Sequence, residues 1–113
     1  FLDRNKGIIL VQSGVEKDRI DQTVKAIRNE LEQIVLGNFD DEVIRSAKLS
    51  LSDSLDGVFD SPEGIDGWYS SQQTSSTVKT PSQVKEEINA VTKEEIMTAA
   101  SFVTLDTIYI LEN

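Results

Sequence analysis

The chain has 113 residues, of which 20 are acidic and 11 are basic, and it contains neither histidine nor cysteine. Because imidazole and thiolate are the usual zinc ligands and the usual bases and nucleophiles of hydrolytic sites, their absence excludes a His-bearing zinc site and a Ser-His-Asp or Cys-His arrangement. The formal charge of −9 would repel phosphate backbones and anionic membrane surfaces, so we expect neither nucleic acid nor a membrane as a partner.

The first predicted element is a strand over residues 7–13, which read Gly-Ile-Ile-Leu-Val-Gln-Ser. A β-branched apolar run of this length is typical of a strand buried on both faces. A long helix is predicted from Asp18 as its N-cap, because apolar residues recur at spacings of three and four and form one stripe. These residues are Ile20, Val24, Ile27, Leu31, Ile34 and Val35. Gly37 then supplies a residue that tolerates a left-handed helix end.

A second long helix is predicted from Asp40 and Asp41, whose carboxylates favour the positive end of the helix dipole. One face of this helix is apolar and carries Ile44, Ala47, Leu51, Leu55 and Val58. The two long helices are expected to form the body of the domain.

Two or three short helices are predicted next. Ser61 followed by Pro62 is a helix-start signature, and the helix it begins is expected to be weak and to end near Gln73. The polar stretch at residues 75–77 predicts a loop. Thr80 and Thr92 each begin a capping box and therefore each start a further short helix.

Residues 107–111, Thr-Ile-Tyr-Ile-Leu, predict a closing strand. The predicted fold class is therefore α+β, with two terminal strands of a small sheet bracketing two long and two or three short helices. Two strands rarely make an independently stable sheet, so either they pair with each other under the helices or further chain completes the sheet. An uncovered apolar edge at residues 8–11 invites pairing with a second copy, so we expect the isolated chain to self-associate.

The start at Phe1 rather than Met indicates a piece of a longer protein, and no signal peptide is visible. The longest apolar runs are about four residues, far short of the roughly 20 that span a bilayer. The absence of cysteine is compatible with a reducing compartment, so the expected location is cytoplasmic.

Four stretches carry a resemblance to a known family. They are residues 7–15, the long helix ending in Leu36-Gly37, residues 39–43 with Ala47-Lys48 behind them, and residues 88–96, which read Ile-Asn-Ala-Val-Thr-Lys-Glu-Glu-Ile. Together they resemble the back half of one homologous domain in the pitrilysin/insulinase-type zinc metallopeptidases, the inverted-motif group that includes mitochondrial processing peptidase. The likeness spans nearly the whole chain, and its most specific part is residues 90–96 with Ala99-Ala100 and the closing strand behind them.

This resemblance implies that residues 1–113 are a single partial domain, the C-terminal segment of a pitrilysin-like, metallohydrolase-like domain. Members of the family place two or four similar domains around an enclosed chamber. One domain holds zinc through a His-x-x-Glu-His motif and a distant Glu, and the peptide substrate lies against a sheet edge. Because this sequence has no His, the resemblance implies no cofactor in this segment and zinc only in the parent protein. An active parent and an inactive homologue both stay open.

In the non-metal domain of such peptidases, an Arg and a Tyr that help to hold the substrate usually precede the strand corresponding to residues 8–11. Arg4 lies before that strand here, but no suitably placed Tyr follows it. The resemblance therefore carries no catalytic, metal-binding or substrate-binding residue over to this chain.

Trp68 and Tyr69 form the one aromatic pair. Their rings have apolar bodies and polar tips, so they could contact a partner domain or a peptide. They could equally fill the gap between a short helix and the sheet, and both interpretations are kept.

Two further patterns have weaker chemical interpretations. A Ser-x-x-Lys pattern occurs at residues 76–79 and at residues 82–85, where helix-start chemistry is the favoured explanation over an acyl-enzyme pair. A set of acids near the end of the second long helix resembles a hard-cation site only in composition, and solvated helix surface is the favoured explanation. Its members are Asp53, Asp56, Asp60 and Glu63.

The leading hypothesis is a structural or substrate-chamber segment of a zinc-dependent peptidase or of its inactive homologue, with no catalytic site of its own. Its expected partners are other domains of the parent peptidase or a homologous subunit, with peptide substrate bound through the parent. The alternative is a free-standing acidic module that binds another protein through Trp68 and Tyr69 or through its strand edge.

Overall fold

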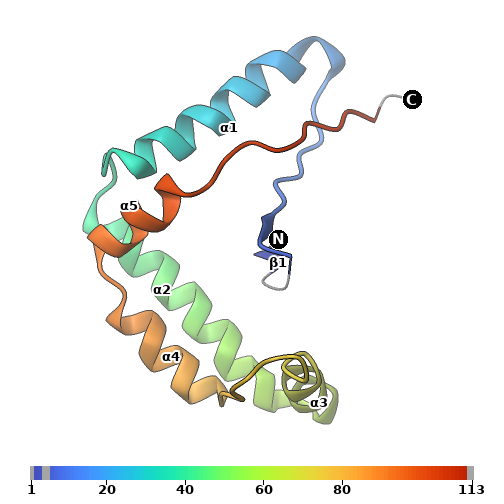
Figure 1. Ribbon diagram of the computed structural model, residues 1–113, viewed down its shortest axis with the longest axis vertical. Coiled ribbons are helices and arrows are strands. Elements are labelled where there is room, and N and C mark those ends of the chain that lie inside the picture. The colour runs from blue at the N-terminus through green and yellow to red at the C-terminus, as the bar shows by residue number, and fades with distance from the viewer. Residues whose placement is uncertain (1, 4–5, 112–113) are drawn as a thin grey trace. The chain divides into compact units, whose positions relative to one another are not determined.

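The computed structural model describes residues 2–3 and 6–111 (Figure 1). The two strands are β1 (Leu2–Asp3) and β2 (Ile8–Ile9), and the helices are α1 (Ile20–Val35), α2 (Asp41–Asp56), α3 (Pro62–Ser70), α4 (Pro81–Ala90) and α5 (Lys93–Ser101). Single 3-10 turns at Lys17–Arg19 and Gly57–Asp60 precede α1 and follow α2. Helices together with one small antiparallel sheet confirm the predicted α+β class.

The chain divides into two compact units. The terminal unit comprises the residues up to Glu32 together with those from Leu105 onward, and the helical unit comprises Gln33–Thr104. Each unit is described by itself below.

The sheet belongs to the terminal unit. β1 and β2 pair antiparallel, with Leu2 opposite Ile9 and Asp3 opposite Ile8. The backbone N–H of Lys6 donates to Oδ1 of Asp3 at 3.1 Å, and Gly7 has a φ of +63°, which favours glycine. A short connection makes this pairing inexpensive in loop-closure entropy.

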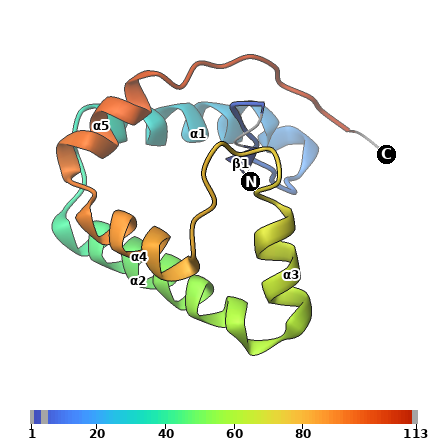
Figure 2. The same cartoon turned by 60° about the horizontal axis from the view of Figure 1, so that its bottom comes forward.

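The placement of the strands differs from the sequence-based prediction. Of the strand expected over residues 7–13, only Ile8–Ile9 is formed, and its partner is β1 rather than the far end of the chain. The strand expected over residues 107–111 is not formed, and this segment runs as an open, extended trace in both views (Figures 1 and 2). A β-branched pattern favours an extended backbone, but a strand also needs a ladder of hydrogen bonds with a second segment, and in the described residues the one sheet pairing is that of β1 with β2.

The predicted long helix is present as the 3-10 turn followed by α1, but Asp18 is not its N-cap: it lies inside the turn, and Glu16 stands at the cap position with no side-chain hydrogen bond to the turn. The predicted end of the helix at Gly37 is confirmed, because Gly37 has a φ of +74°. The N–H of Gly37 donates to the carbonyl of Ile34 at 3.1 Å, and the N–H of Asn38 donates to that of Gln33 at 2.9 Å. This pair of bonds is the Schellman arrangement, which satisfies the last carbonyls of a helix.

Capping residues set the starts of the other helices as predicted. The Asp40 carboxylate accepts from the N–H of Val43 at the start of α2, and the Ser61 hydroxyl accepts from that of Gly64 at the start of α3. α4 and α5 both begin with complete capping boxes, formed by Thr80 with Gln83 and by Thr92 with Glu95.

The core of the helical unit is small and lies mainly between α2 and α4, which run side by side in both views (Figures 1 and 2). All the buried residues in the described part of the chain belong to this unit: Ser52, Leu55, Pro81, Val84 and Ala100. The ammonium of Lys48 donates to the carbonyls of Asn89 at 2.9 Å and Val91 at 2.6 Å, so it satisfies the C-terminal end of α4. At the other end of the pair, Lys85 forms an ion pair with Asp56 at 2.6 Å.

Residues of α5 contact the turn between α1 and α2. Lys93 donates from Nζ to the carbonyl of Phe39 at 2.7 Å, and its ammonium lies 4.8 Å from the centre of the Phe39 ring. A Cβ placed on Gly37 would come within 2.9 Å of the sulfur of Met97. Glycine is therefore required here both by its φ and by the close approach of α5.

Candidate partner-contact site

Trp68 lies on α3 and is half-buried. Its indole Nε1–H donates to the carbonyl of Lys79 at 2.9 Å, and the Gln72 side chain donates to the same carbonyl at 3.0 Å. In return, the N–H of Lys79 donates to Oε1 of Gln72 at 2.8 Å. Trp68 and Gln72 thus hold the loop between α3 and α4 through hydrogen bonds to Lys79. The indole N–H of Trp68 is therefore already bonded within the chain.

Tyr69 is placed differently from its neighbour. Its side chain is 39% exposed, and Ile65, one turn earlier on the same face of α3, is 37% exposed. Phe59 and Val78 are also exposed on the segments that flank α3. Of the predicted pair, Tyr69 is therefore the residue available to a partner, while Trp68 has a defined role in packing.

Neither Ser-x-x-Lys pattern brings a lysine to a serine. The ammonium of Lys79 lies 2.7 and 2.8 Å from the two carboxylate oxygens of Glu87, and that of Lys85 pairs with Asp56. A lysine that acts as a base must face its nucleophile, and both ammonium groups are instead engaged by carboxylates. These side chains stabilise helices and the loop between them.

The described residues do not fit a zinc site. In residues 2–3 and 6–111, no group of three or more His, Cys, Asp or Glu side chains converges to hold a metal ion. The four acids singled out from the sequence do not converge either, and one of them, Asp56, is paired with Lys85. Arg4, which precedes the predicted first strand and to which the resemblance assigned no role, lies outside the described residues.

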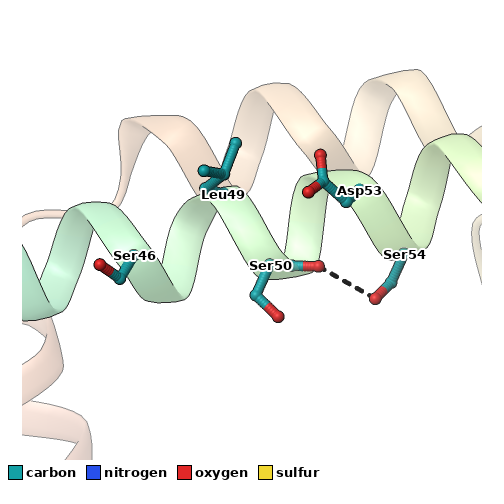
Figure 3. Close-up of a pocket in the computed structure, with 5 residues that line it drawn as sticks. All are labelled: Ser46, Leu49, Ser50, Asp53 and Ser54. Atoms are coloured by element: carbon teal, nitrogen blue, oxygen red, sulfur yellow. Dashed lines mark hydrogen bonds between the residues drawn. The ribbon is translucent and has the colours of Figure 1, made fainter.

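An open depression that the sequence analysis missed lies along α2 (Figure 3). It is lined by Ser46, Leu49, Ser50, Asp53 and Ser54. The hydroxyl of Ser54 donates to the backbone carbonyl of Ser50 at 3.0 Å, so that group is already satisfied. The spacing of four between the serines is the sequence signal for this face. Because all five residues are exposed and come from one helix, no second element encloses a ligand there.

Exposed apolar side chains are the most distinctive surface feature of both units. In the terminal unit they follow β2 and the last residues of the chain: Ile8, Ile9, Leu10, Val11, Ile108, Tyr109, Ile110 and Leu111. In the helical unit they include Val43, Leu49, Leu51 and Phe102. Large exposed apolar side chains of this kind are candidates for contact with a partner. Within the described part of the chain, no helix is both long and apolar enough to cross a bilayer.

Comparison with known proteins gives one informative similarity. Over 108 residues, 95% of this chain, the sequence is 29% identical to a protein of Bacillus subtilis (strain 168) named "Probable inactive metalloprotease YmfF". The chain is similar to a metalloprotease-related protein. It spans about a quarter, 25%, of the length of that relative. No family model matches the chain, and no solved structure matches it.

Proposed function

We propose that this chain is a non-catalytic structural segment of a peptidase-related protein, in which residues 1–113 are the C-terminal segment of one pitrilysin-like domain. The observation that carries the proposal is the similarity along 95% of the chain to a relative whose name describes it as a probable inactive metalloprotease. Two features of the chain support the same role. The sequence has no His or Cys, and apolar side chains are exposed on both compact units.

In this role the chain forms part of the wall of a substrate chamber. Other domains of the parent protein, or a homologous subunit, cover its apolar faces, and peptides reach it only through the parent. Zinc, where the parent has it, is held by a different domain, because this sequence lacks the imidazoles of a catalytic zinc site. The position of Tyr69 supports a contact with such a partner domain.

Two measurements test the proposal. The purified chain, incubated with a library of fluorogenic peptides and with zinc or a chelator, is expected to show no hydrolysis above a blank without protein. Zinc-dependent hydrolysis by pure material would contradict it. In addition, the codons flanking this sequence are expected to encode further peptidase-like domains, which should co-purify with the chain when expressed as separate polypeptides. Flanking codons that encode no such domain would also contradict it.

A free-standing acidic interaction module is the second candidate, and the exposure of Tyr69 beside Ile65 supports it. The two functions differ in what binds the chain. For a free-standing module, Tyr69→Ala is expected to abolish binding to an unrelated protein partner, whereas Leu49→Ala on α2 would leave that binding unchanged. A chamber-wall segment would instead bind only the domains encoded beside it.

A further inference from the structure

The negative charge of the chain is unevenly distributed along the sequence. Residues 49–78 comprise the second half of α2, the 3-10 turn Gly57–Asp60, α3 and most of the loop that follows α3, and they contain five acidic side chains but no lysine or arginine. The five acids are Asp53, Asp56, Asp60, Glu63 and Asp66. Residues 1–48, by contrast, carry nine acidic and eight basic side chains. More than half of the formal charge of −9 therefore belongs to one stretch of the helical unit.

Most of these acids have no cation beside them. Asp56 is paired with Lys85 of α4, but none of the ion pairs formed within the described residues includes Asp60, Glu63 or Asp66. The helix dipole favours Glu63, which lies in the first turn of α3. Asp66 lies beyond that turn, and it is a neighbour of Glu63 because residues three apart face each other on a helix. A positive group from outside the chain would relieve the repulsion between these two carboxylates.

The same helix presents exposed apolar side chains. Ile65 and Tyr69 lie one turn apart on one face of α3, and Asp66, three residues before Tyr69, lies next to them. Trp68 is bonded to the loop behind α3, so it does not compete for this face. Ile65, Asp66 and Tyr69 are named the α3 face below. An aromatic ring and a carboxylate at neighbouring positions attract the same cationic group, through the face of the ring and through an ion pair.

This combination restricts the chemistry of a partner. A purely apolar partner would remove the carboxylate of Asp66 from water without compensating its charge, which is costly. A purely cationic partner would leave Ile65 and Tyr69 exposed, and exposed ion pairs alone contribute little. A second copy of the chain brings the same negative charges and is repelled. A segment with both positive and apolar side chains fits each requirement.

We propose that the α3 face binds a positively charged, amphipathic segment of a partner protein. Lysine or arginine side chains of that segment pair with Asp66 and Glu63, and its apolar side chains cover Ile65 and Tyr69. The inference rests on the partner contact proposed above for Tyr69 and specifies the chemistry of that partner. The two proposals fail separately. Peptide hydrolysis by the pure chain would contradict the structural role without affecting this surface, whereas a surface that binds no cationic segment would leave the structural role in place.

Titration calorimetry of the full chain with three synthetic peptides tests the proposal. The first peptide has lysines on one face of a helix and leucines on the other, the second replaces its leucines by serine, and the third replaces its lysines by glutamate. The lysine–leucine peptide is expected to bind at least about tenfold more tightly than either of the others, because only it matches both the charge and the apolar side chains. Raising the salt concentration from about 0.05 M to about 0.5 M is expected to weaken this binding, because salt screens the attraction between charges.

Substitutions locate the contact. Asp66→Asn and Tyr69→Ala are each expected to weaken binding of the lysine–leucine peptide at least about fivefold, and Asp66→Glu, which keeps the charge, should bind as the unaltered chain does. The matched controls are Glu30→Gln on α1, which also removes one negative charge, and Tyr109→Ala, which also removes an exposed tyrosine ring. Both controls are expected to leave binding unchanged. Far-UV circular dichroism of every variant shows whether its helices are retained.

The opposite outcomes are equally clear. The proposal is wrong if the lysine–leucine peptide does not bind at about 1 mM, or if the lysine–serine peptide binds as tightly, since net charge alone would then explain the attraction. Binding that persists in both Asp66→Asn and Tyr69→Ala, or that the two controls weaken equally, would place the contact elsewhere on the chain. A loss in Asp66→Glu as large as that in Asp66→Asn would show that the charge at this position is not what the peptide recognises.

Discussion

Gly37 has both a left-handed backbone, with a φ of +74°, and a close neighbour in Met97. Gly37→Ala is expected to lower the free energy of unfolding by about 1–3 kcal/mol, because the new Cβ is strained by the φ and meets the Met97 sulfur. Urea denaturation followed by circular dichroism measures the change. In a double variant with Met97→Ala, only the part of the Gly37→Ala destabilisation that comes from the close contact should be recovered.

Gly14→Ala is the control for this substitution. No heavy atom lies within 4 Å of a Cβ placed on Gly14, and its φ is outside the left-handed region. Alanine there is expected to be neutral or to stabilise by up to about 1 kcal/mol, because it restricts the unfolded chain. Equal losses at Gly14 and Gly37 would mean that the Schellman turn has no special requirement for glycine.

Lys48 connects α2 to the end of α4 through two backbone carbonyls. Lys48→Met keeps most of the aliphatic chain but leaves those carbonyls without the ammonium, so a loss of about 1–3 kcal/mol in the free energy of unfolding is expected. Lys25→Met, on an exposed position of α1, should change stability by less than about 0.5 kcal/mol. Thermal or urea unfolding of the two variants side by side provides the comparison.

For single residues, the sequence predicts hydrogen bonds to neighbouring residues well and hydrogen bonds to residues far away in sequence poorly. The caps at Asp40, Ser61, Thr80 and Thr92 were predictable because each bonds a backbone group three residues away. The bonds of Lys48 were not, because their acceptors lie 41 and 43 residues away in sequence. For the same reason the hydrogen bonds from Trp68 and Gln72 to Lys79 were not predicted, although the aromatic pair itself was singled out with packing and partner contact as its two interpretations.

Among the elements, α5 is short, so its start contributes much of its stability. Thr92→Ala is expected to cost about 1 kcal/mol, because it removes the hydroxyl that accepts from the N–H of Glu95 and leaves only the bond from the N–H of residue 92 to the Glu95 carboxylate. Thr98→Ala, in the middle of the same helix, removes only a hydroxyl that donates to the carbonyl of Glu94 and should be neutral or stabilising. A cost at Thr98 equal to that at Thr92 would argue against the role of the cap.

The helices were predictable as elements, whereas the strands were not. A helix satisfies its backbone hydrogen bonds within its own residues, so the apolar stripe of α1 and the caps of α2 to α5 are enough to predict each helix from one stretch of sequence. A strand depends on a second segment, and the pattern at residues 107–111 cannot specify one. β1 was missed because it is only two residues long, although Asp3 and Gly7 flank a turn and gave a usable signal.

For the whole molecule, the uneven distribution of buried side chains predicts uneven stability. α2 and α4 pack against each other around the small core. Their backbone amides are therefore expected to exchange with solvent deuterium only when the helical unit unfolds. Amides at residues 8–19 and 103–111 lack a core and should exchange at least tenfold faster at low protein concentration. Hydrogen exchange with mass spectrometry measures both sets in one sample, and uniform protection along the chain would contradict this expectation.

The terminal unit contains both early and late residues, which affects when it can form during translation. A ribosome that has released the chain through Thr104 has already supplied all of the helical unit, and domains generally fold as their residues emerge. The residues up to Glu32 must wait for Leu105 and its successors. Throughout that interval the terminal unit is incomplete, and the apolar residues of β2, which stay exposed afterwards as well, are accessible to a chaperone that recognises extended apolar segments.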